Sequence, residues 1–68
     1  MNSLDQLETQ SLVSMRSIMV RQIKNTGEES VYALHMGYPT DDLFDRIEFF
    51  SRMTSRIDAV LIARGVEY

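Results

Sequence analysis

The residues best suited to chemistry lie close together in the segment Ile23-Lys24-Asn25-Thr26-Gly27. Lys24 offers a mobile positive charge with three donors, Thr26 offers a hydroxyl group, and Gly27 offers a backbone that another group could approach closely. Together these groups could hold a phosphodiester. The same spacing also fits a solvated helix face with a tolerated glycine, and the residue types alone leave both interpretations open.

The other candidate groups have ordinary structural explanations. Arg64 stands where the last helix is expected to end, and a cation there gains from the helix dipole. Asp41, Asp42 and Asp45 could bind a cation, but acidic residues at a helix start are explained by the same dipole. His35 is the only histidine and fits an ordinary helix position. No nucleophile with a partner base, phosphate loop or dinucleotide fingerprint is present, so the sequence predicts no enzyme, no metal site and no cofactor.

Three tyrosines could stack on a nucleotide base. They are Tyr32, Tyr38 and Tyr68. Tyrosines in such positions are also typical half-buried packing residues, so the sequence does not assign them to a site.

Composition limits the chain to a small single domain, residues 1–68, with a formal net charge of -3. A binder of duplex nucleic acid usually has a basic surface, which argues against that partner. No segment approaches the length of a membrane span, so we expect no membrane partner and a cytoplasmic location. There is no cysteine, and so no disulfide, to reinforce a thin core. Self-association is then the expected additional source of stability.

The stretch Thr40 to Arg64 predicts a long helix. Its apolar residues recur at the three- and four-residue spacing of one helix face: Leu43, Phe44, Ile47, Phe50, Met53, Ile57, Val60 and Leu61. Thr40 is placed to accept a hydrogen bond at the helix start, and Gly65 is placed to end the helix in a left-handed conformation. Glu48 precedes Arg52 by four residues, which predicts an ion pair on the outer face.

A second amphipathic helix is predicted from Leu12 onward. Leu12, Met15, Met19 and Ile23 form its apolar row, with Val13, Ile18 and Val20 beside them, and Arg16, Arg21 and Lys24 take outer positions. Gly27 either ends this helix or lies within it, and we favour a continuous or kinked helix in which another backbone or a ligand approaches Gly27.

The breaker Gly37-Tyr38-Pro39 separates the two helices. So short a turn makes them antiparallel neighbours. The break in the apolar pattern at residues 9–11 predicts a short extra helix at the front. The predicted fold is therefore all-α: a short N-terminal helix and two long antiparallel helices forming a helical hairpin.

The order of these features resembles a known family. Ile23, Lys24 and Gly27 form an Ile-Lys-x-x-Gly pattern, Pro39 lies in the following turn, and Ala59-Val60-Leu61-Ile62-Ala63-Arg64 ends the long helix. Over residues 12–64 the chain is similar to the phage anti-CBASS cyclic-nucleotide sponges, whose hairpin domain is shared with anti-Thoeris sponges. The family's aromatic residue in the first helix has no counterpart before Tyr32, and the tryptophan common in the long helix of relatives is also absent.

The resemblance implies an assembly, an activity and site residues. The assembly would be a homohexamer that sequesters, without cleaving, cyclic di- and trinucleotides such as cyclic GMP-AMP, and so protects a phage from bacterial immunity in the host cytoplasm. It implies that Lys24, beside Gly27, contacts a cyclic dinucleotide at a subunit junction, and that Thr26 and Arg64 belong to a trinucleotide pocket. The alternative function is a small helical adaptor or inhibitor that binds a host protein through its apolar face.

Overall fold

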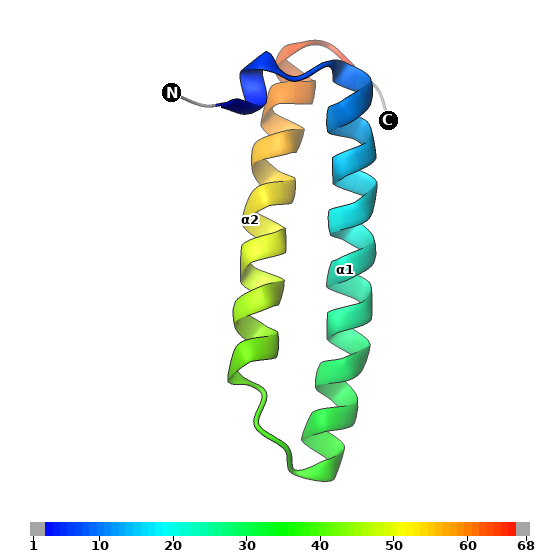
Figure 1. Ribbon diagram of the computed structural model, residues 1–68, viewed down its shortest axis with the longest axis vertical. Coiled ribbons are helices and arrows are strands. Elements are labelled where there is room, and N and C mark those ends of the chain that lie inside the picture. Colours follow the sequence, from blue (N-terminus) through cyan, green and yellow to red (C-terminus); the bar gives the residue numbers. More distant parts are fainter. Residues whose placement is uncertain (1–2, 67–68) are drawn as a thin grey trace.

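The protein is a helical hairpin in a computed structural model that describes residues 3–66. A single turn of 3-10 helix, η1 (Ser3–Gln6), precedes two long antiparallel helices, α1 (Thr9–Met36) and α2 (Asp41–Ala63) (Figure 1). No other regular element occurs among the described residues. The predicted hairpin is thus confirmed, whereas the segment before α1 forms a 3-10 turn, and a short N-terminal α-helix is not confirmed.

Both long helices end at a glycine in the left-handed conformation. Gly37 has φ 76° and Gly65 has φ 72°, values that side chains with a Cβ rarely adopt. The N–H of Tyr38 donates to the Ala33 carbonyl at 2.8 Å, and the N–H of Val66 donates to the Leu61 carbonyl at 3.0 Å. These bonds satisfy carbonyls that the end of a helix leaves free, so each helix ends where its sequence predicts.

The start of α2 differs from the prediction in its hydrogen bonding. Thr40 occupies the cap position, but its side chain makes no capping hydrogen bond. Its ψ is 0°, outside the extended region in which a capping side chain normally reaches the first free amides. The Thr40 carbonyl instead accepts the N–H of Phe44 at 3.0 Å. Asp41 and Asp42 in the first turn suit the positive end of the helix dipole, as predicted.

The large buried side chains gather at the open end of the hairpin, away from the turn. There η1 contributes Leu4 and α1 contributes Leu12, both packed against Ile57, Val60 and Leu61 of α2. Leu12, Ile57 and Leu61 are fully buried, and Val66 after α2 packs against the same cluster. The open end is the better packed half because η1 and the C-terminal turn close over it (Figure 1).

Towards the turn, the buried positions of α1 are occupied by small residues. They are Thr26, Ser30 and Ala33. The Ser30 hydroxyl donates to the Thr26 carbonyl at 2.8 Å, which satisfies a polar group that would otherwise be buried without a partner. This half of the hairpin therefore buries little apolar surface.

Several residues of the predicted apolar faces are exposed in the single chain. Phe44 keeps 48% of its surface accessible, Ile18 keeps 51% and Val20 keeps 42%. These side chains stay exposed because one neighbouring helix covers a narrower arc than the apolar pattern spans. The molecule measures 44 × 24 × 14 Å, a single layer of two helices. Its broad sides are consequently uncovered.

Candidate functional site

The candidate site residues Lys24, Thr26 and Gly27 lie in the middle of α1, which runs without interruption through Gly27. The preferred prediction of a continuous helix is confirmed. Lys24 is exposed, as predicted, and Gly27 is half-buried. Lys24 makes no ion pair with any carboxylate in residues 3–66, so its ammonium group is available to an external anion.

Thr26 faces in a different direction from Lys24. Only 5% of its surface is accessible, because it lies on the side of α1 that packs against α2. In a helix, residues two apart point to different sides, so these two side chains do not converge within one chain. A pocket that includes the Thr26 hydroxyl would need access between the two helices.

Arg64 lies at the other end of the hairpin. Its Nη1 donates to the hydroxyl of Thr9 at 3.2 Å, at the very start of α1. Fifteen residues of helix separate Thr9 from Lys24, or about 22 Å at 1.5 Å per residue. One chain therefore does not bring Arg64 to Lys24, and a shared pocket would have to combine residues of different copies.

An ion pair between Arg16 and Asp58 joins α1 to α2 near the core. Arg16 Nε lies 2.6 Å from an oxygen of Asp58, with about a third of each side chain accessible. The sequence pattern places Arg16 at an outer position of its helix and predicts no pair between it and Asp58. Their opposite charges and similar distances from the turn are the signal that could have paired them, since antiparallel helices bring such residues side by side. Glu29 and Arg46 form a looser pair at 3.9 Å.

We expect the Arg16–Asp58 pair to stabilise the hairpin by about 1 kcal/mol, since part of its surface remains solvated. A double-mutant cycle with Arg16→Ala and Asp58→Ala, read by urea denaturation, measures that coupling. The predicted ion pair between Glu48 and Arg52 is confirmed, and it is the matched control because it is exposed and within one helix. Its coupling should be below about 0.5 kcal/mol. Equal couplings in the two cycles would contradict the expectation.

The aromatic candidates lie near the turn. The rings of Tyr32 and Tyr38 have centroids 6.4 Å apart and are tilted by 53°. Both tyrosines are more than half exposed, so they are not buried packing residues. Tyr68, the third tyrosine considered, lies outside the described residues. Lys24 precedes Tyr32 by eight residues, about 12 Å along α1, which places this aromatic pair beyond direct reach of the Lys24 ammonium group.

The capacity to hold a metal ion and the capacity to cross a membrane also bear on the kind of site. Within residues 3–66, no group of three or more histidine and acidic residues is arranged to hold a metal ion. None of the helices described has both the length and the apolar content needed to cross a bilayer.

Comparison with known proteins identifies no relative: no family model, curated protein or solved structure matches this chain.

Proposed function

We propose that this chain associates with copies of itself and sequesters small cyclic oligonucleotides, without cleaving them. The observation that carries the proposal is that Lys24 is exposed, makes no ion pair among residues 3–66 and lies one turn before Gly27, whose surroundings in that part of the chain are open. A phosphate could approach the backbone at Gly27 while the Lys24 ammonium group neutralises its charge. The resemblance of residues 12–64 to phage anti-CBASS sponges supports the choice of a cyclic di- or trinucleotide.

Association would supply the additional positive charges that one chain lacks around Lys24. A cyclic dinucleotide carries two negative charges, and a symmetric junction presents the same lysine more than once. A few basic residues per chain can then form a locally positive site in a protein of net charge -3. The separation of Arg64 from Lys24 within one hairpin fits a scheme in which sites are completed by other copies, with the homohexamer as the proposed assembly. The role would be evasion of bacterial immunity in the host cytoplasm during phage infection.

The test is titration calorimetry of the purified protein with cyclic di- and trinucleotides, alongside their linear counterparts. We expect at least one cyclic nucleotide to bind with a dissociation constant below about 1 μM, equivalent to about -8 kcal/mol. The nucleotide should be recovered unchanged after incubation. No heat from any member of the panel at micromolar protein would refute the proposal.

A second candidate function is supported by the apolar surface around the turn. Seven large side chains there are each about half exposed or more: Val31, Tyr32, Leu34, Met36, Tyr38, Phe44 and Phe49. Exposed apolar clusters of this kind are typical of protein-binding surfaces, and an adaptor or inhibitor of a host protein would use one. A chain that stays monomeric in solution and binds no nucleotide would favour the adaptor.

A further inference from the structure

No contact or backbone conformation in the described part of the chain requires a glycine at position 27. Gly27 lies in regular helix, and its φ is not positive. A Cβ built at this position meets nothing within 4 Å in the described part of the chain. Glycine inside a helix is less favourable than alanine by about 1 kcal/mol. The described packing of the hairpin thus does not require a glycine at position 27, and the open space beside it leaves room for a group from outside the chain.

Apolar side chains continue the surface on both sides of Gly27. Val20 and Leu34 lie seven residues before and after it, which is two helical turns in each direction, and Val31 lies one turn after it. Their exposed fractions are 42% for Val20, 69% for Val31 and 60% for Leu34. We call these four residues, Val20, Gly27, Val31 and Leu34, the α1 stripe. The spacing matches the seam of a helix that packs against another helix.

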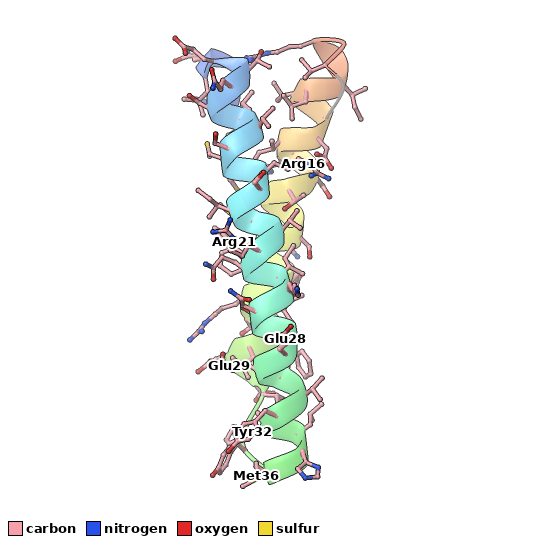
Figure 2. The ribbon with its side chains drawn as sticks, turned by 90° about the vertical axis from the view of Figure 1, so that its right-hand side faces the viewer. Arg16, Arg21, Glu28, Glu29, Tyr32 and Met36 are labelled. Atoms are coloured by element: carbon pink, nitrogen blue, oxygen red, sulfur yellow. The ribbon has the colours of Figure 1, made fainter. Side chains whose placement is uncertain are left out.

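The α1 stripe lies on one flank of the hairpin, beside the surface that packs against α2. Gly27 follows Arg16 by eleven residues, close to three turns, so the two residues share a side of α1. Figure 2 shows Arg16 on one side of α1, with Arg21 and Glu29 on the other. The positions of α1 that face α2, such as Thr26 and Ser30, are already buried. The stripe is therefore a second packing surface that the single chain leaves open.

The elongated chain exposes more surface than a compact monomer of the same mass. A compact monomer of 7.9 kDa exposes about 4,400 Å². This chain exposes 5125 Å². The excess of about 700 Å² is spread over the whole molecule, and it leaves enough uncovered surface for an interface of standard size, to which each partner contributes roughly 800 Å².

We infer that the α1 stripe is the contact between two copies of this chain, packed antiparallel about a two-fold axis that passes beside Gly27. The equal spacing of Val20 and Leu34 from Gly27 supports this arrangement, because a two-fold axis there brings Val20 of each copy against Leu34 of the other. With no side chain at the crossing point, the two backbones approach closely and the flanking side chains interdigitate.

The two-fold arrangement also determines how far apart the Lys24 residues of the two copies lie. Each Lys24 lies three residues from the axis, so the two copies hold their Lys24 residues about 9 Å apart along the helix direction. Two like charges at this separation oppose association, and an anion with two phosphates between them would favour it. This step rests on the proposed function, whereas the contact between the stripes does not.

The experiment compares Gly27→Gln with Asn25→Gln. Both changes put the same long, uncharged side chain on α1, but Asn25 is exposed and lies away from the stripe. Sedimentation over a range of protein concentrations measures association, and circular dichroism measures helix content. We expect Gly27→Gln to raise the dissociation constant of the pair at least about tenfold and Asn25→Gln to change it less than about threefold, with helix content preserved in both.

A second comparison uses Val31→Gln and Ile18→Gln. Both positions are exposed, and Ile18 lies outside the stripe. Only the Val31 variant should weaken association. The inference is overturned if the unmodified chain is monomeric up to millimolar concentration, or if Gly27→Gln associates as tightly as Asn25→Gln. Association through the stripe with no heat from any nucleotide would uphold this inference and refute the proposed function. Nucleotide binding by an assembly that Gly27→Gln and Val31→Gln leave intact would refute this inference and uphold the proposed function.

Discussion

Replacing Ile57 by alanine is expected to lower the free energy of unfolding of the hairpin by about 2–5 kcal/mol, a large share of its total stability. Ile57 is fully buried between η1, α1 and α2, and truncating such a side chain costs about 2–5 kcal/mol through lost burial and the cavity left behind. A chain of 68 residues has a total stability of about 3–10 kcal/mol. One substitution would therefore remove much of it. Urea denaturation followed by circular dichroism measures the loss.

Ile62→Ala is the matched control for this prediction. Ile62 is on the same helix and loses the same atoms, but 69% of its surface is accessible. Its change in stability should stay within about 0.5 kcal/mol, as is usual for exposed positions. Similar losses for Ile57→Ala and Ile62→Ala would show that the core does not lie at the open end of the hairpin.

Replacing Lys24 by glutamine is expected to weaken cyclic-nucleotide binding by about 10- to 100-fold. The change removes a positive charge that would contact a phosphate, and a charge-assisted hydrogen bond is worth about 1.5–3 kcal/mol. Helix content and thermal stability should be unaffected, because Lys24 is exposed and makes no ion pair in the described part of the chain. Calorimetry with the best-binding nucleotide of the panel measures the effect.

Arg21→Gln provides the control for charge alone. Arg21 is also exposed on α1, but it points to the flank away from Arg16 and the α1 stripe (Figure 2). Arg21→Gln removes one positive charge, as Lys24→Gln does. Its effect on the dissociation constant for the nucleotide should be less than about threefold and should vanish at high salt. Equal losses for the two variants would mean that binding depends on overall charge, with no site at Lys24.

The same comparison separates a specific site from the adaptor alternative. An adaptor that uses the apolar surface around the turn would be insensitive to both substitutions. It would instead lose its partner when Leu34 or Phe44 is replaced by a polar residue, since both are exposed members of that surface.

Features that depend only on residues close together in the sequence could be predicted from the sequence. The two long helices, their glycine ends at Gly37 and Gly65 and the continuity of α1 through Gly27 follow from local hydrogen bonding and backbone preference. The exposure of Lys24 follows from its place on the polar side of an amphipathic helix. The Glu48–Arg52 pair is equally local, because the two residues are one turn apart.

Only the tertiary structure decided which residues of each apolar face are covered. Ile57 is buried while Phe44, on the same predicted face, is exposed, because η1 and α1 cover the open end and nothing in the described chain covers Phe44 to the same extent. The burial of Thr26 and the Arg16–Asp58 pair likewise depend on how far one helix is shifted along the other. Periodicity reports the direction of a side chain on its own helix. What lies opposite that side chain depends on the register of two segments far apart in the sequence, which local pattern does not encode.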